Sequence, residues 1–266
     1  MELGACKGDW ALITGASSGI GREFALQLGA AGLNLVLVAR RQPLLDDLAV
    51  ALSQRHGIRV VAISVNLSHP GAISAIGSRL VAEDVRVRLL CNNAAFGSWG
   101  DFEKTPAPTY QEMIKVNVAA VVDLCHHFFP VLSSFPTSAI INVSSPAAYQ
   151  PVPYMAVYAA TKSFLHSFSQ ALYGEWKDRG ILVQALVPGP TATEFDQVAG
   201  AYASALKERG TPHKVVKDAL DHLAKDTPVV TSAKGTYRQR FFAALFPPRM
   251  VIRTVKRMFQ PPSTKP

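Results

Sequence analysis

The segment WALITGASSGIG, residues 10–21, runs from a short apolar stretch through a glycine-rich turn into the expected start of a helix. In a strand–turn–helix unit of this kind, Gly15 allows the tight turn, Gly19 lets the backbone approach a pyrophosphate, and Gly21 lets the helix pack close to the strand. The free N–H groups at a helix start favour bound phosphate. The spacing GxxxGxG therefore predicts a dinucleotide-binding loop. The alternative is a turn that serves only the packing of strand against helix.

Similar short apolar runs, rich in Val, Ile and Leu, recur at regular intervals, as is typical of strands buried on both faces of a parallel sheet. They cover residues 10–14, 34–39, 58–64, 87–92, 139–144 and 181–187, with a further edge strand expected at 228–232. Helical periodicity fills the gaps, at 19–31, 43–56, 70–83, 109–133 and 154–179. This alternation predicts an α/β fold: a single Rossmann-type, doubly wound parallel sheet of about seven strands, with helices on both faces and a helical C-terminal tail.

Composition narrows the class of protein. With 48% hydrophobic and 17% charged residues among 266, the chain can bury a large core and is not a disordered chain. The three cysteines are odd in number and form no CxxC pair, which indicates a reducing compartment, and no metal site is expected. The start MELGACKGDW lacks the features of a signal peptide, and no uncharged apolar run reaches 18 residues. We therefore expect a cytoplasmic protein, with contact to a membrane surface left open.

The net charge of +8 is confined to the end of the chain. No acidic residue follows Asp226, whereas eight basic ones do, and residues 1–226 carry 19 basic and 19 acidic side chains. A neutral body argues against a nucleic-acid-binding surface, so no nucleic-acid partner is expected. We expect a Rossmann domain over residues 1–232, including a substrate loop at 190–227, and a basic amphipathic extension over 233–266.

The extension has a helical pattern over 249–259. At 100° per residue, one face gathers apolar side chains and the opposite face gathers basic ones, Arg249, Arg253, Lys256 and Arg257. A helix of about 16 Å is too short to span a bilayer. Three roles remain open: packing of the apolar face on the domain or a sister subunit, peripheral contact with an anionic membrane, and contact with an acidic carrier protein.

Three motifs occur together in chain order: the glycine-rich loop, NNA at 92–94, and Tyr-x-x-x-Lys after a strand that ends in serines. As a set, over residues 9 to about 195, they resemble the short-chain dehydrogenase/reductase family. The resemblance implies an oxidoreductase that uses a nicotinamide dinucleotide and forms a homodimer or homotetramer.

The second strand indicates which dinucleotide is used. It runs into VARRQP, where Arg40 and Arg41 replace the carboxylate that would bind a ribose 2′-OH, and a guanidinium fork suits a 2′-phosphate. NADP(H) is therefore the expected cofactor. The resemblance implies further contacts from Gly15, Ser17, Ser18, Gly19, Ile20, Gly21, Asn66, Leu67, Asn93, Ala94, Pro188, Gly189, Thr191 and Thr193. Two positions depart from the family pattern: Asn66 stands in place of the usual aspartate, and Ala95 in place of the glycine of NNAG.

Two Tyr-x-x-x-Lys pairs compete for the catalytic role: Tyr158 with Lys162, and Tyr173 with Lys177. In a βαβ unit the start of the helix lies near the carboxyl edge of the sheet, where ligands bind. Tyr173 lies about 22 Å further along the helix at 1.5 Å per residue. We therefore assign general acid–base chemistry to Tyr158, where a neighbouring ammonium from Lys162 favours the phenolate. In the family this lysine also binds the nicotinamide ribose.

Ser145, thirteen residues before Tyr158, matches the family serine that hydrogen-bonds the substrate carbonyl, and Ser144 is its rival. Asn117 resembles the family asparagine that supports a water-linked proton relay to the lysine. The alternative for Asn117 is an ordinary buried helix asparagine that bonds to backbone groups.

The residues expected to contact substrate are apolar or aromatic, which favours a hydrophobic ketone, an acyl thioester or a sterol-like alcohol. They are Ala95, Phe96, Trp99, Ser145, Ala147, Tyr149, Tyr154 and Phe195. The alternative is that half of them are core or subunit contacts. We expect an NADP(H)-dependent carbonyl reductase or alcohol dehydrogenase. The rival hypothesis is a non-catalytic NADP(H)-binding sensor or scaffold on the same fold.

Overall fold

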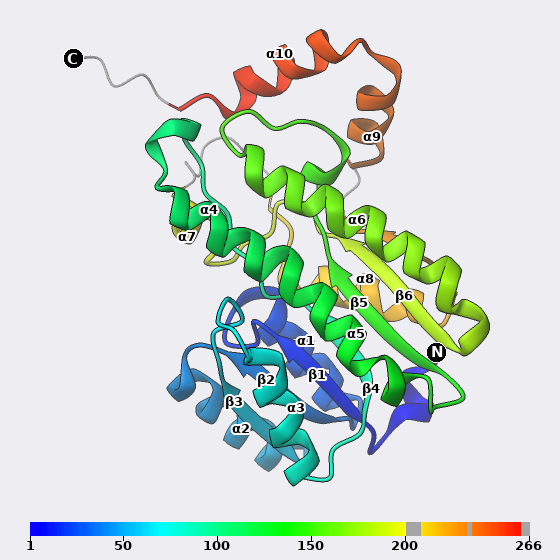
Figure 1. Cartoon of the computed structure of the whole chain (residues 1–266). Helices are drawn as coiled ribbons and strands as arrows, with labels where there is room; N and C mark the ends of the chain where they lie inside the picture. The colour runs from blue at the N-terminus through cyan, green and yellow to red at the C-terminus, as the bar shows by residue number, and fades with distance from the viewer. Residues whose placement is uncertain (201–208, 233–235, 262–266) are drawn as a thin grey trace.

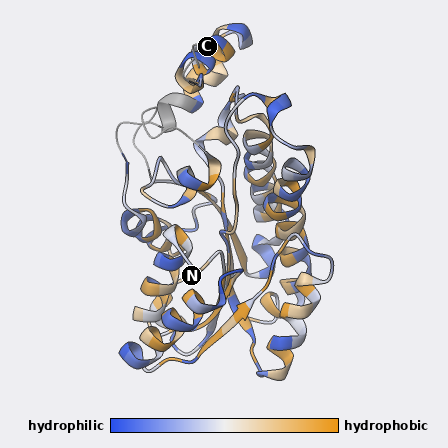
Figure 2. Ribbon diagram, turned by 90° about the vertical axis from the view of Figure 1, so that its left-hand side faces the viewer, coloured by the Kyte–Doolittle hydropathy of each residue, from blue (hydrophilic) through white to orange (hydrophobic). Residues whose placement is uncertain are grey.

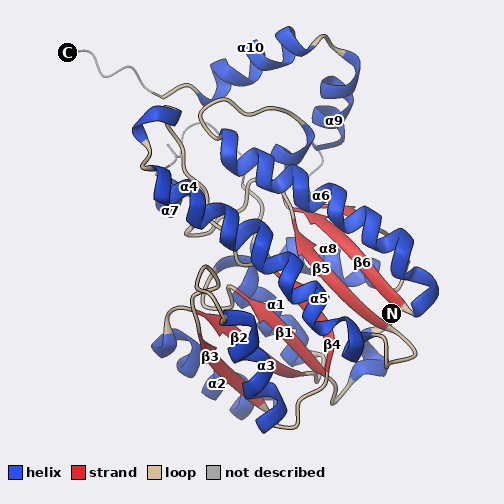
Figure 3. Ribbon diagram, viewed as in Figure 1, coloured by secondary structure: helices blue, strands red, loops and turns tan. Residues whose placement is uncertain are grey.

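The sheet has seven parallel strands in the order β3-β2-β1-β4-β5-β6-β7 (Figures 1 and 3). The computed structural model describes residues 1–200, 209–232 and 236–261. The strands are β1 Trp10–Thr14, β2 Asn34–Ala39, β3 Val60–Ser64, β4 Val87–Asn92, β5 Ser138–Val143, β6 Ile181–Val187 and β7 Val229–Thr231. The structure confirms the doubly wound α/β prediction, including the edge strand.

Helices cover both faces of the sheet. One face carries α1 Gly19–Ala30, α2 Gln42–His56 and α8 Pro212–Leu223, and the other carries α3 Ala72–Ala82, α5 Ala120–Leu132 and α6 Ala156–Trp176. The hydropathy colouring shows an apolar sheet between helices that are polar on their outer faces (Figure 2). The remaining helices are α4 Ala107–Ile114, α7 Phe195–Ala199, α9 Thr236–Leu245 and α10 Pro248–Phe259, with short 3₁₀ turns at Leu3–Cys6, Phe102–Lys104, Pro146–Tyr149 and Lys177–Arg179.

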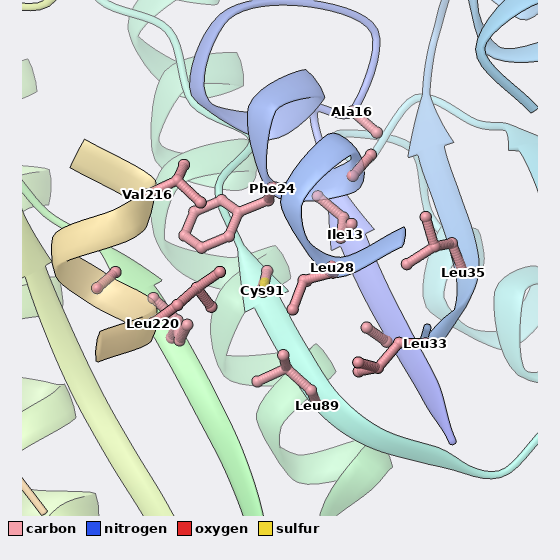
Figure 4. Close-up of a cluster of buried hydrophobic side chains, with 14 of the residues drawn as sticks. Ile13, Ala16, Phe24, Leu28, Leu33, Leu35, Leu89, Cys91, Val216 and Leu220 are labelled. Atoms are coloured by element: carbon pink, nitrogen blue, oxygen red, sulfur yellow. The ribbon is translucent and has the colours of Figure 1, made fainter. Parts of the chain in front are cut away.

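The core on the α1 side explains why the apolar runs form strands. Phe24 of α1 lies between the sheet and Val216 of α8, with Ile13 and Leu89 beneath it (Figure 4). All four are buried. Some residues of β1 and β4 pack in this core, and their neighbours pack in the core on the opposite face of the sheet. Both faces of these strands are buried, so the strands must be apolar throughout.

The order of the strands shows where on the sheet a ligand would bind. Because β1 lies between β2 and β4, the chain leaves the carboxyl ends of β1 and β4 toward opposite faces of the sheet. Ligands of open α/β sheets bind in the crevice that opens at such a switch point. The glycine-rich loop after β1 and the NNA segment that ends β4 therefore meet there.

The predicted helix over 109–133 is divided. Lys115–Ala119 forms a π-helical turn between α4 and α5. Together, Ala107–Leu132 is the one helix among the described residues that is long and apolar enough to cross a membrane. Core helices also meet this criterion, and α5 packs against β4, β5 and α3.

Helix α8 was not predicted. It lies inside the expected substrate loop 190–227, of which residues 201–208 fall outside the described part of the chain. Thr211 caps it through a hydrogen bond from Lys214 N, Pro212 opens it, and five apolar residues with helical spacing bury one face. Those signals were present in the sequence.

The C-terminal helix α10 agrees with the prediction for 249–259, although its apolar face is only partly covered. Val251 and Val255 are buried in a third apolar cluster that includes Met113 and Met155. Trp99 Nε1 donates a hydrogen bond of 2.8 Å to the Phe259 carbonyl and fixes the end of the helix. Packing against the Rossmann domain thus buries part of the apolar face of α10. Residues 233–235 and 262–266 of the expected extension lie outside the described residues.

Candidate active site

A cavity of about 1010 Å³ opens at the carboxyl edge of the sheet. Its wall combines the loops after β1, β2, β4, β5 and β6 with the start of α6. One end is lined by the glycine-rich loop and arginine side chains, and the other by apolar and aromatic side chains. The same cavity therefore offers a polar, phosphate-compatible end and an apolar end.

The glycine-rich loop forms the floor of the polar end. Gly15 has φ +67°, and a Cβ there would lie 2.8 Å from Asn93 Nδ2 and 3.0 Å from Ala94 Cα. A Cβ on Gly21 would overlap the Gly15 carbonyl oxygen, so Gly21 contributes by close packing and does not line the cavity. Four of the five residues between them line it: Ser17, Ser18, Gly19 and Ile20. The start of α1 thus leaves room for a diphosphate against backbone N–H groups.

Thr14, which the sequence reasoning missed, joins this loop to the end of β4. Its hydroxyl oxygen accepts hydrogen bonds of 3.0 Å from both Asn93 N and Ala94 N. Asn93 Nδ2 donates in return to the Thr14 carbonyl at 2.9 Å. Asn93 and Ala94 line the cavity, so these bonds fix the wall at the switch point. A threonine directly before the first glycine was the available signal.

Arg40 and Arg41 both line the polar end. Arg41 donates to Ser17 Oγ at 3.0 Å and forms an ion pair of 2.9 Å with Glu194 on the far side of the cavity. The hydrogen bond from Arg41 lowers the pKa of Glu194. Glu194 is a site residue that the sequence did not reveal, because 153 positions separate it from Arg41. An incoming phosphate would share Arg41 with this carboxylate.

The remaining predicted cofactor contacts also lie on the cavity wall: Asn66, Leu67, Pro188, Gly189, Thr191 and Thr193. Three of them already make internal side-chain hydrogen bonds, and in one of these Thr193 Oγ1 accepts from Phe195 N at 3.3 Å. Asn66 Oδ1 accepts hydrogen bonds from the backbone N–H and the hydroxyl of Ser68. Thr191 Oγ1 donates to the Gly189 carbonyl at 2.8 Å. Among the described residues, no group of His, Cys, Asp and Glu is arranged to hold a metal ion.

Tyr158 and Lys162 project from the first turns of α6 into the middle of the cavity wall. Lys162 is 2% exposed, its Nζ donates to the Val143 carbonyl at 2.8 Å, and it lies 5.7 Å from the centre of the Tyr158 ring. Burial lowers the pKa of Lys162 to about 7. An amine that titrates near neutrality, next to a phenol in a cleft, is typical of proton-transfer sites.

The second pair is in a different environment. Tyr173 and Lys177 do not line the cavity. Lys177 Nζ is bonded to the Tyr173 hydroxyl at 2.8 Å and to Asp226 at 2.6 Å. The second Tyr-x-x-x-Lys pair therefore has a structural role in these contacts, and no catalytic role is needed to explain it.

The serines after β5 differ in what their hydroxyls do. Ser144 is buried and donates to the Lys162 carbonyl at 3.0 Å, which ties β5 to α6. Ser145 Oγ accepts a hydrogen bond of 3.2 Å from Ala147 N, so its hydroxyl hydrogen is not used in that bond. Both residues line the cavity. The geometry favours Ser145 as the hydrogen-bond donor to a ligand.

Asn117 does not line the cavity. It is fully buried in the π-helical turn, where its amide nitrogen donates to the Phe96 carbonyl at 2.9 Å and to Thr161 Oγ1 at 3.1 Å. Its amide oxygen accepts from Phe96 N at 3.1 Å. The side chain thus joins the loop after β4 to α6, which matches the alternative of a buried asparagine bonded to backbone groups.

The apolar end contains most of the predicted substrate residues: Ala95, Phe96, Trp99, Ala147 and Phe195. Met155, Val198 and Phe259 complete it, and Phe259 reaches it from α10. Tyr149 and Tyr154 require correction, because neither lies on this wall. Tyr149 packs edge-on against His166, and Tyr154 adopts a left-handed turn (φ +68°) in which its carbonyl accepts from Gly100 N.

The family model of the short chain dehydrogenases matches residues 9–202. This range contains the glycine-rich loop, the NNA segment and the Ser145–Tyr158–Lys162 set. The chain belongs to the short chain dehydrogenase family.

Relatives of this short chain dehydrogenase are named for different substrates. A very-long-chain 3-oxoacyl-CoA reductase of Laccaria bicolor is 37% identical over 189 residues, which cover 70% of this chain and 55% of that protein, so the chain spans about half the length of this relative. A 7β-hydroxysteroid dehydrogenase of Collinsella aerofaciens is 28% identical and is matched over 88% of this chain and 90% of that protein.

Among solved structures, a short-chain dehydrogenase from Sphingobium yanoikuyae in complex with NADPH matches with a TM-score of 0.81 and 33% identity. The match covers 89% of this chain and 93% of that one. The two short chain dehydrogenases therefore share the fold over nearly their whole lengths.

Proposed function

We propose that the protein is an NADP(H)-dependent oxidoreductase that interconverts a ketone and a secondary alcohol by hydride transfer. One observation carries this proposal: Ser145, Tyr158 and Lys162 line the same cavity as the glycine-rich loop. A protein that only binds a dinucleotide needs the loop but has no use for the three together.

NADP(H) fits the polar end. Gly15 and Gly19 line it without side chains, Gly21 lets the loop pack closely beneath, and Arg40 and Arg41 offer guanidinium groups where β2 ends. The relative from Sphingobium was solved with NADPH, which supports the same choice here. When bound, NADPH supplies the hydride.

The side chains of the protein transfer the proton and bind the carbonyl oxygen of the substrate. In reduction, the Tyr158 hydroxyl donates its proton to the oxygen that becomes the alcohol, and the remaining phenolate is stabilised by the ammonium of Lys162. The Ser145 hydroxyl donates a hydrogen bond to the same oxygen and stabilises the charge that develops there. In oxidation, the phenolate accepts the alcohol proton.

Asn117 is proposed as a positioning residue. Its three side-chain hydrogen bonds hold the Phe96 backbone and Thr161, and Thr161 directly precedes Lys162 in α6. Its contribution to a proton relay remains a prediction.

The apolar end supports a hydrophobic carbonyl substrate, namely an acyl thioester, a lipid-like ketone or an aromatic ketone. The names of two relatives, a very-long-chain 3-oxoacyl-CoA reductase and a 7β-hydroxysteroid dehydrogenase, agree with this class.

The test is NADPH consumption against a panel of such ketones and thioesters, with Tyr158→Phe as the control. Turnover of at least one compound that the variant does not turn over would support the oxidoreductase. A wild type no faster than Tyr158→Phe on every compound, together with retained NADPH binding, would favour the rival hypothesis of a sensor or scaffold.

Three further expectations remain proposals. They are the division into a domain over 1–232 and an extension over 233–266, a cytoplasmic location, and a homodimer or homotetramer. Ile114 of α4 and Phe164 of α6 are exposed large apolar side chains, which supports subunit contacts through these helices. Sedimentation velocity of the wild type and of Ile114→Glu tests the oligomer.

A further inference from the structure

Helices α9 and α10 form a hairpin, residues 236–259, that stands beyond the carboxyl edge of the sheet (Figures 1 and 2). We call it the C-terminal hairpin. It is anchored to the body by Val251, Val255 and the bond from Trp99 to Phe259. These contacts hold α10 against the body.

The turn of the C-terminal hairpin exposes large apolar side chains. Phe241 is 69% exposed, Leu245 66%, Phe246 42% and Met250 47%. These four residues lie within ten positions of one another, and their exposure is not needed for the anchoring described above. A concentrated apolar patch of this kind marks an interaction surface.

Basic side chains lie on both helices that flank the apolar turn, and one of them, Arg240, lies 5.9 Å from the centre of the Tyr149 ring. Arg240 of α9 and four residues of α10 are exposed, and none of the five pairs with a carboxylate among the described residues: Arg240, Arg249, Arg253, Lys256 and Arg257. The chain also contains no acidic residue after Asp226 that would neutralise them. On α10 the basic side chains lie opposite the buried Val251 and Val255, so they point away from the body.

We propose that the C-terminal hairpin docks the protein on an anionic lipid surface. Such a surface takes up apolar side chains and attracts basic ones over the same area, and needs no shape complementary to a two-helix turn. A second copy of the chain fits less well, because symmetric pairing through this face would bring two basic surfaces together. An acidic protein would match the charge but leaves the four apolar side chains of the turn unexplained.

Docking on lipid would also place the substrate end of the cavity near the membrane. This consequence rests on the function proposed above. Phe259, the last residue of α10, lines the apolar end. A hairpin seated on lipid thus holds the substrate end of the cavity close to the membrane surface, where lipid-like ketones reside.

The test is co-sedimentation of the full chain with vesicles of phosphatidylcholine containing phosphatidylglycerol and with vesicles of phosphatidylcholine alone. Neither vesicle assay depends on catalysis, so its outcome is separate from that of the NADPH assay. Binding is expected only with the anionic lipid, weakening as salt rises.

Two sets of variants locate the surface. Replacing Arg253, Lys256 and Arg257 by Gln is expected to weaken binding about a hundredfold, from the usual contribution of a basic residue at an anionic surface. Replacing Arg55, Lys115 and Lys225 by Gln removes the same charge elsewhere and is the matched control. Phe241→Ser with Leu245→Ser is expected to weaken binding without changing the charge.

Several results would overturn the proposal. They are absence of binding to anionic vesicles at low salt, equal losses in the hairpin and control charge variants, and a fall in sedimenting mass of the free protein caused by the hairpin variants. The last result would assign the hairpin to contacts between copies. Retention by an acidic protein without any vesicle binding would assign it to a protein partner.

Discussion

Lys162 makes the stability of the protein depend on pH in a direction that its burial fixes. Burial lowers the pKa of Lys162 from 10.5 to about 7, so the folded protein releases this proton in a range where the unfolded chain still holds it. The unfolded state therefore binds more protons between these two values, and stability rises with pH across the window. The pKa difference corresponds to about 5 kcal/mol, of which about 2 kcal/mol falls between pH 7 and about pH 9.

The perturbation is Lys162→Met, which keeps an unbranched side chain only one atom shorter and removes its charge. The variant is expected to be the more stable protein at pH 7, because it no longer buries an ammonium without an anionic partner. Its advantage shrinks by about 2 kcal/mol by about pH 9. The buried thiols of Cys91 and Cys125, whose pKa values burial raises, titrate in both proteins and cancel in the comparison.

Urea unfolding of both proteins at the two pH values measures this double difference. Parallel changes in the free energy of unfolding of wild type and variant would refute the reasoning. They would mean that Lys162 keeps an ordinary pKa in the folded protein and is not desolvated.

Three further predictions concern cofactor, packing and the anchored helix. Arg40→Ala with Arg41→Ala should lower NADPH affinity about ten- to a hundredfold in a fluorescence titration while leaving NADH affinity almost unchanged, because only the 2′-phosphate is lost as a partner; an equal loss for both nucleotides would contradict the assignment. Gly21→Ala should lower the free energy of unfolding by about 1–3 kcal/mol in urea, since its Cβ overlaps a carbonyl oxygen of the phosphate loop, and an unchanged midpoint would show that the loop can yield. Trp99→Phe removes the hydrogen bond to Phe259 and should speed tryptic cleavage within α10 about fivefold; unchanged cleavage would mean that other contacts hold the helix.

The parts of the fold that depend on local pattern were predictable. Continuous apolar runs identified the seven strands, and helix direction in a βαβ unit separated Tyr158 from Tyr173 before any coordinates. The miss at α8 came from treating 190–227 as one loop, although Thr211 and Pro212 mark a helix start.

Contacts between distant segments were not predictable. The pair Arg41–Glu194 and the bond from Trp99 to Phe259 join residues 153 and 160 positions apart, and neither spacing leaves a periodic signal. Tyr149 and Tyr154 are close in sequence to residues that line the cavity. The backbone of the segment between β5 and α6 nevertheless places neither of them on the cavity wall. Side-chain direction in such a turn depends on backbone dihedrals that composition does not encode.

The phenol of Tyr158, next to Lys162, is the group on which the proposed chemistry depends. Its most direct test is a single-turnover measurement of NADPH oxidation with a ketone that the wild type reduces, comparing wild type, Tyr158→Phe and the matched control Tyr173→Phe. Loss of a positioned general acid is expected to slow the reaction at least about a hundredfold in Tyr158→Phe with NADPH binding retained, whereas Tyr173→Phe stays near the wild-type rate. Equal rates in the two variants would contradict the account.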